Sequence, residues 1–266
     1  MTAARLLLAN AAVVALCFAV LWRIAVRIGD VSFVDSWWAL GMVVLAGTSL
    51  AANGAPTPRQ VLLFALCAAW GARLGIHLLR RWRGNGPDRR YVALLGRVQS
   101  ERGLGFARAA LQYVFALQAP LQFIVALPVQ LGQIGRGPIG PLAIAGAALA
   151  LFGMAFESIG DWQLARFKRD PAQAGRVLDT GLWRYTRHPN YFGDCCVWWG
   201  LWLIAAQGGV LGAATIVGPI LLTFLLTRWS GVPTVEGRMR RHTPGYEDYA
   251  RRTSGFVPWR PRSPCP

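Results

Sequence analysis

The sequence predicts an all-α integral membrane protein, a bundle of seven transmembrane helices with its polar loops on one side. Hydrophobic residues make up 54% of the 266 residues and charged residues only 15%, whereas soluble proteins average about 25% charged residues. The chain also contains 12 Trp, a residue that is enriched at membrane interfaces. This composition excludes both a soluble globular protein and a disordered chain.

Seven apolar runs approach the roughly 20 residues that a helix needs to cross a bilayer. They cover residues 6–28, 34–52, 60–79, 109–130, 138–159, 192–207 and 210–228. No strand is expected, because strands cross a bilayer only within a closed barrel. We treat the chain as a single membrane domain. Its substrate-side half, 1–130, holds four spans, and its second half, 131–266, holds three spans and a cytosolic tail.

The arginines predict the orientation of these spans. They cluster in residues 80–108, in residues 160–191 and in the tail after Arg228, whereas the opposite side receives only Arg5, Arg59 and Arg136. By the positive-inside rule the N-terminus is outside and the C-terminus is cytoplasmic. The net charge of +16 therefore favours anionic lipid and an anionic cofactor as partners, and not nucleic acid.

Two motifs are expected to carry no chemistry. The five Cys lack metal-ligand spacing, so they predict inert thiols and no metal site. The glycines at 135, 137 and 140 spell GxGxxG. That pattern indicates a dinucleotide site only between a strand and a helix. Here it lies between two apolar runs, so we interpret it as a glycine-rich turn.

The second basic segment, 160–191, carries the chemistry. Pro171 is expected to end a helix that continues from the fifth span, and Pro189 to start the sixth near Asn190. Free backbone N–H groups there, beside Arg184, Arg187 and His188, form an anion site. Asp161 lies at the inner end of the fifth span, and Asp194 shares a helix face with Asn190. Such groups suit ribose hydroxyls and a base. The alternative is a loop that binds lipid headgroups. Asp161 and Asp194 argue against it, because acids beside apolar spans are costly unless they have a function.

The stretch from Phe156 to Trp199, with its core GLWRYTRHPNYFGD, resembles the C-terminal region of the steroid 5-alpha-reductase family. The whole chain resembles the family's bacterial membrane branch, strongly over about the last 120 residues and by span layout before that. The resemblance implies a seven-helix bundle of the bacterial inner membrane, with NADPH in a cytosol-facing cavity. It implies cofactor-binding roles for Asp161, Arg176, Tyr185, Asn190 and Asp194, a basic family position at Lys168, and, more loosely, roles for Arg238, His242 and Tyr249. Glu157 stands where the steroid reductases have an asparagine.

The RHPNY core, which also contains Tyr191, is shared with another family. Isoprenylcysteine carboxyl methyltransferases hold S-adenosylmethionine with a similar loop, whereas the ending from Asn190 to Asp194 is typical of the sterol reductases. We therefore favour an NADPH-dependent reductase of an enone-type double bond in a lipophilic steroid-like or isoprenoid substrate. The alternative is a membrane methyltransferase that acts on a lipidic acceptor. A third hypothesis is a non-enzymatic protein that binds lipid or another partner.

The catalytic residues are expected in the first half of the chain. Enone reduction needs a hydrogen-bond donor at the carbonyl oxygen, and the Gln-Glu pair of the steroid reductases is absent. Asp35 in SFVDSWW lies at the inner end of the second span, with a helix N-cap as its ordinary role. Trp70 occupies the family's tyrosine position and cannot act as an acid. Tyr91 in PDRRY is its replacement, with an interfacial anchor as its ordinary role.

Overall fold

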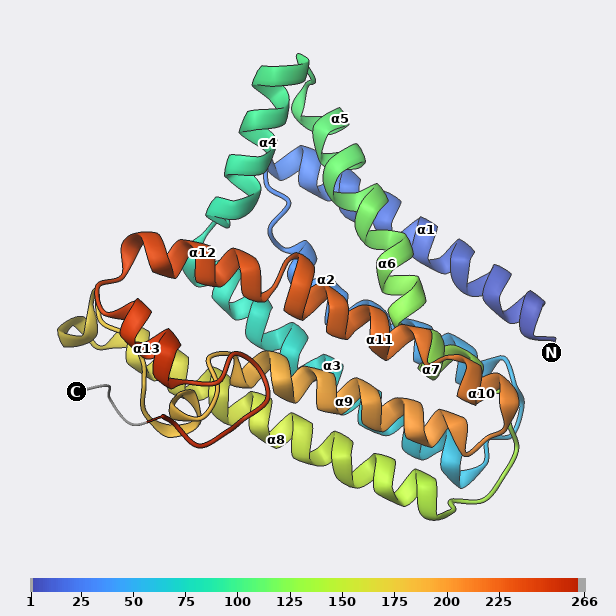
Figure 1. The fold of residues 1–266 in the computed structure, drawn as a ribbon. Coiled ribbons are helices and arrows are strands. Elements are labelled where there is room, and N and C mark those ends of the chain that lie inside the picture. Colours follow the sequence, from blue (N-terminus) through green and yellow to red (C-terminus); the bar gives the residue numbers. More distant parts are fainter. Residues whose placement is uncertain (1, 263–266) are drawn as a thin grey trace. The chain divides into compact units, whose positions relative to one another are not determined.

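Long apolar helices make up most of the protein (Figure 1). The computed structural model describes residues 2–262, and within that range it contains no strand. The first three helices are α1 (Ala3–Ile28), α2 (Val34–Ala51) and α3 (Pro58–Asn85). Gly29 ends α1 in the left-handed conformation. Thr57 and Gln60 form a capping box that starts α3.

The remaining helices are shorter or broken, apart from α8. The basic segment that follows the third apolar run is itself helical, because α3 continues to Asn85 and α4 begins at Arg89. Pro171 follows the end of α8, and α9 begins at Pro189, as the prolines predicted. In chain order the elements are α4 (Arg89–Arg102), α5 (Phe106–Ala110), the π-turn η1 (Leu111–Phe115), α6 (Ala116–Val125), α7 (Leu127–Leu131), α8 (Pro141–Arg169), the short helices η2 (Pro171–Gln173) and η3 (Gly181–Arg184), α9 (Pro189–Ala206), α10 (Val210–Ala214), α11 (Val217–Phe224), the π-turn η4 (Leu225–Trp229), α12 (Val232–His242) and α13 (Tyr246–Arg252).

Five helical segments are long and apolar enough to cross a membrane, which makes this a multi-pass integral membrane protein. Within the described residues they are Ala3–Ile28, Val34–Ala51, Pro58–Asn85, Pro141–Arg169 and Val210–His242. Large apolar side chains on these helices are exposed, such as Leu8 at 72% and Leu151 at 55%, as expected for surfaces that face lipid. The predicted run 109–130 is divided among α5, η1, α6 and α7, and the run 192–207 falls on the 18-residue helix α9.

The chain forms two compact units. Unit 1 comprises residues 1–144 and 201–218, and unit 2 comprises residues 145–200 and 219–266. Unit 1 contains α1 to α7 and α10, whereas unit 2 contains most of α8 and α9 together with α12 and α13. The candidate site residues divide in the same way, because Asp35 and Tyr91 belong to unit 1 and the predicted cofactor residues belong to unit 2.

A buried arginine ties helix ends together in unit 1. Arg59 is fully buried, and its guanidinium donates to the carbonyl oxygens of Gly132 at 3.1 Å and Ile204 at 3.0 Å. These carbonyls belong to the last turns of α7 and α9, where helix carbonyls lack partners of their own. The positive charge also lies at the negative ends of the helix dipoles. Arg59, which the charge pattern predicted to lie on the side with few basic residues, is therefore a structural cap.

Glycines bring α8 and α9 into close contact in unit 2. A Cβ atom on Gly153 would lie 2.5 Å from the backbone oxygen of Gly193, and one on Gly200 would lie 2.6 Å from the backbone nitrogen of Ala150. Small residues let membrane helices approach to backbone contact. Gly160 continues this contact to Pro189, the first residue of α9. The inner end of α8 is therefore held against the start of α9, where the predicted cofactor residues lie.

We expect Gly153→Ala to destabilise the protein by about 1–3 kcal/mol, because the new methyl group overpacks the contact between α8 and α9. Gly96→Ala on α4 is the matched control. A Cβ atom there meets nothing within 4 Å, so the helix preference of alanine is expected to be neutral or slightly stabilising. Thermal unfolding in detergent measures both changes. Equal effects of the two substitutions would contradict the close approach of α8 and α9.

Candidate functional site

Asp35 and Tyr91, the two predicted catalytic residues, are in direct contact in unit 1. The Tyr91 hydroxyl donates to Asp35 Oδ1 at 2.7 Å, although 56 residues separate the two in sequence. The other oxygen of Asp35 accepts from the Arg90 guanidinium at 3.0 Å, and the Arg81 guanidinium lies 3.9 Å away. Asp35 lies in the first turn of α2, whose N-cap is Phe33. The ordinary N-cap role for Asp35 is therefore wrong, and its carboxylate is used in tertiary contacts.

A glutamine and an indole fix the orientation of the Tyr91 hydroxyl. Gln118 Nε2 lies 3.0 Å from the Tyr91 oxygen, and Trp38 Nε1 donates to Gln118 Oε1 at 2.8 Å. Because an indole N–H can only donate, the amide oxygen of Gln118 must face Trp38 and its NH₂ group must face Tyr91. The Tyr91 oxygen thus accepts one hydrogen bond and directs its own proton to Asp35.

Burial beside a carboxylate keeps Tyr91 protonated. Burial, reinforced by the neighbouring Asp35 carboxylate, raises the pKa of Tyr91 well above its ordinary value. Both oxygens of Asp35 act as acceptors, so Asp35 offers no proton in this arrangement. The group that can donate a proton here is therefore the phenol of Tyr91, with Asp35 as its support.

The predicted cofactor residues of unit 2 start from a polar pair between two helices. Asn190, at the start of α9, donates through Nδ2 to Asp161 Oδ1 on α8 at 3.2 Å. Asp161 is buried, at 8% exposure. Asp194 lies one turn beyond Asn190 on the same face of α9. The chain thus places an amide and two carboxylates at one helix junction, a set of groups that fits hydroxyl and amide groups of a ligand.

Two of the three residues predicted to form an anion site, Arg187 and His188, bind a carboxylate of the protein itself, whereas Arg184 is exposed. Arg187 Nε donates to Glu236 Oε1 at 2.8 Å, and its NH1 donates to the carbonyl oxygens of Ala250 and Thr253. The His188 Nε2 atom lies 3.2 Å from the same Glu236 oxygen. Because Glu236 belongs to α12, these contacts attach the C-terminal tail to the loop that precedes α9.

Aromatic residues complete this attachment. The His188 and Tyr191 rings are stacked, with centroids 5.4 Å apart. The Tyr249 hydroxyl donates to the Trp183 carbonyl at 2.6 Å, and Tyr249 is buried at 3% exposure. Burial raises the pKa of Tyr249, so its phenol remains a hydrogen-bond donor at neutral pH. Tyr249 is therefore anchored to the loop and positions α13.

The other predicted cofactor residues lie at the surface. Tyr185 is 44% exposed. Four basic residues from this set are also exposed: Lys168, Arg176, Arg238 and His242. The last two are four residues apart and lie on one face of α12. Exposed cations on a loop and a helix suit phosphate groups. These exposed cations can bind phosphate, whereas Arg187 already binds Glu236.

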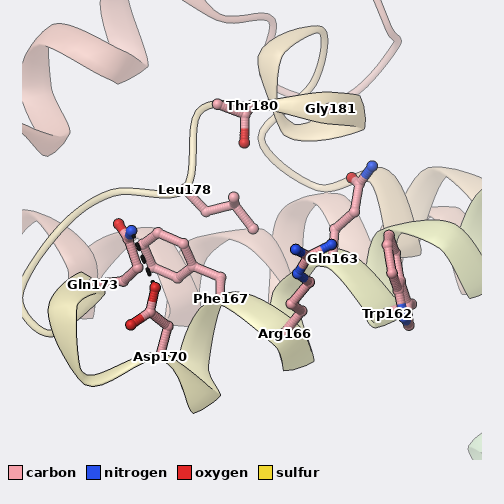
Figure 2. Close-up of a pocket in the computed structure, with 9 residues that line it drawn as sticks. All are labelled: Trp162, Gln163, Arg166, Phe167, Asp170, Gln173, Leu178, Thr180 and Gly181. Atoms are coloured by element: carbon pink, nitrogen blue, oxygen red, sulfur yellow. Dashed lines mark hydrogen bonds between the residues drawn. The ribbon is translucent and has the colours of Figure 1, made fainter.

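A cavity of about 330 Å³ lies beside the inner end of α8, but not on the face of Asp161. It is lined by Trp162, Gln163, Arg166, Phe167, Asp170, Gln173, Leu178, Thr180 and Gly181 (Figure 2). With 3.6 residues per turn, the α8 residues on this lining face away from Asp161 and Lys168. The cavity is therefore distinct from the polar pair of Asp161 and Asn190.

Sequence reasoning missed two residues of these networks. Gln118 is one of four glutamines within the mostly apolar run 109–130, and polar side chains within a span are the signal that could have found it. Glu236 lies in VEGRMRRH among basic residues, where a surface ion pair is the ordinary expectation. Its burial at 8% exposure depends on packing against Arg187 and His188, for which the local sequence holds no signal.

Comparisons with known proteins identify a family without an assigned activity. The family model described as "Protein of unknown function (DUF1295)" matches residues 21–253. No curated protein and no solved structure matches the chain significantly.

Proposed function

The chain belongs to the DUF1295 family, and from its own residues we propose that it is a membrane-embedded, NADPH-dependent reductase of enone-type double bonds. The substrate class is lipophilic, steroid-like or isoprenoid. The proposal includes seven transmembrane spans in a bacterial inner membrane, with the N-terminus outside and the C-terminus cytoplasmic. The observation that carries it is the hydrogen bond from Tyr91 to Asp35, because it presents an oriented, protonated phenol.

Tyr91 supplies the acid that enone reduction requires. A carbonyl oxygen within hydrogen-bond distance of the hydroxyl would accept the hydrogen bond that Asp35 accepts in this structure. The phenol then stabilises the negative charge that develops on that oxygen as the double bond is reduced. Gln118 and Trp38 hold the phenol oxygen in place, so only its O–H bond has to turn from Asp35 to the substrate.

The residues of unit 2 fit a phosphorylated dinucleotide. NADPH supplies the hydride when it is bound. Asp161 and Asn190 would bind hydroxyl or amide groups, and the exposed cations Lys168 and Arg176 would bind phosphate. The proposed role of Arg187 and His188 is to hold the tail through Glu236, since their polar groups are already used.

The same contacts bear on the alternative, an S-adenosylmethionine-dependent methyltransferase. The part of the motif that the two families share, Arg187 to Tyr191, is used largely for internal contacts. The part typical of the sterol reductases, Asn190 to Asp194, lies at the junction with Asp161. This division favours the reductase, and the response of the protein to S-adenosylmethionine tests the methyltransferase alternative.

We expect NADPH to raise the melting temperature of the purified protein and S-adenosylmethionine to leave it unchanged. Asp161→Ala removes a buried partner of Asn190 and is expected to abolish the NADPH shift. Asp248→Ala is the matched control, because Asp248 is an exposed residue of α13 paired with Arg251. Thermal shift assays with each cofactor measure this. A shift with S-adenosylmethionine and none with NADPH would end the reductase proposal.

A further inference from the structure

The cavity beside α8 has no role in the proposed reaction, yet its lining is specific. Trp162, Arg166 and Phe167 lie on the side of α8 that faces the loop with Leu178 and Thr180 (Figure 2). Gln163 Oε1 accepts from the backbone N–H of Leu182 at 3.0 Å and holds that loop near the helix. Gly181 is required there, because its φ is +61° and a Cβ atom would lie 2.3 Å from the Gln163 amide.

The cavity presents one positive charge over an aromatic ring. The Arg166 guanidinium carbon lies 5.7 Å from the centre of the Trp162 ring, a cation–π contact that orients the side chain. Within residues 2–262, Arg166 forms no ion pair. The one acid in the lining, Asp170, lies at the other end of the cavity, where its carboxylate accepts from the Ala172 N–H at 3.0 Å and from Gln173 Nε2 at 3.4 Å (Figure 2). An anionic group can therefore pair with Arg166 at the end of the cavity next to Trp162.

An apolar stripe on α8 leads to this charge. Phe152, Ile159 and Arg166 are spaced by seven residues, which places them on one face of the helix. Phe152 is 49% exposed and Ile159 is 45% exposed, and both belong to a helix long and apolar enough to span a membrane. Trp162, at 55% exposure, lies between the apolar residues and the charge. Aromatic residues in that position mark the level of the lipid headgroups.

We propose that this cavity binds the headgroup of an anionic phospholipid. The phosphate interacts with Arg166, the headgroup contacts Gln163 and Thr180, and one acyl chain lies along Ile159 and Phe152. The order of the groups along α8 supports this assignment. The exposed apolar stripe matches the acyl chain, the Trp162 indole matches the level of the headgroups, and the Arg166 guanidinium matches the phosphate. A soluble anion has no acyl chain that could contact the apolar stripe. The inference does not depend on the reductase proposal.

The test is lipid retention by the full-length protein. The protein is reconstituted in bilayers of equimolar phosphatidylglycerol and phosphatidylcholine, and native mass spectrometry then measures which lipids remain bound. The wild type is expected to retain phosphatidylglycerol preferentially. Arg166→Gln is expected to reduce this preference about fivefold, which corresponds to the loss of one Arg–lipid contact. Arg169→Gln is the control, because it removes an equal charge three residues away and outside the lining.

Three results would overturn the proposal. Equal losses in the two arginine variants would indicate general surface charge and no site. Displacement of phosphatidylglycerol by inorganic phosphate or by NADPH would assign the cavity to a soluble anion. If Arg166→Gln does not fold, Trp162→Leu provides the test, because it keeps the charge and removes the ring that orients it. Unchanged phosphatidylglycerol retention by a folded Trp162→Leu protein would then refute the site.

Discussion

Replacing Tyr91 by phenylalanine is expected to lower kcat for the reduction of a lipophilic enone about a hundredfold, the usual loss for a general acid. Phenylalanine keeps the ring and its packing but cannot donate to the developing oxyanion. Because the cofactor residues belong to unit 2, the KM for NADPH is expected to stay the same. The measurement is NADPH oxidation by reconstituted protein across a panel of steroid and isoprenoid enones.

Tyr113→Phe is the matched control for this experiment. Tyr113 also lies in unit 1, where its ring contacts the Arg102 guanidinium at 5.5 Å, and a cation–π contact survives the loss of the hydroxyl. Its activity is expected to equal that of the wild type. If Tyr91→Phe reduced an enone at the wild-type rate, the phenol would not be the proton donor, and Asp35 would lose its proposed role as well.

Gln118→Leu separates the position of the hydroxyl from its presence. Leucine has nearly the volume of glutamine but cannot donate to the Tyr91 oxygen, so the phenol keeps its proton and loses one of its two hydrogen bonds. The orientation that Trp38 and Gln118 impose is therefore absent in this variant. If that orientation contributes to the rate, its kcat falls between those of the wild type and Tyr91→Phe.

The local signals in the sequence located the helix boundaries of unit 2 correctly. Proline has no backbone N–H and restricts the residue before it, so Pro171 and Pro189 predicted the end of α8 and the start of α9 within one or two residues. Four-residue spacing placed Asn190 and Asp194 on one helix face in the same way. These features depend on a few neighbouring residues, which is why the sequence alone reveals them.

Features that depend on distant partners were not predictable from such signals. The run 109–130 is mostly apolar, and nothing in its composition indicates the π-turn at Leu111–Phe115 that precedes Gln118. The pairing of Asp35 with Tyr91 joins residues 56 apart. The sequence predicted both as separate candidates, but their contact depends on the start of α2 lying near the start of α4. The N-cap alternative for Asp35 failed for the same reason, since the local preference was overridden by a tertiary partner.

The second large effect is expected in the tail, because the Glu236 carboxylate contacts both the half-buried Arg187 and the buried His188. We expect Glu236→Gln to destabilise the protein by about 3 kcal/mol, since it leaves Arg187, at 14% side-chain exposure, without its ion-pair partner. Limited proteolysis and thermal unfolding measure the change, and cleavage at the arginines of α12 and α13 is expected to accelerate. Glu247→Gln is the control, because Glu247 is 55% exposed and pairs with Arg240 at the surface, where ion pairs contribute little. The tail would not depend on Glu236 if both variants resisted protease equally.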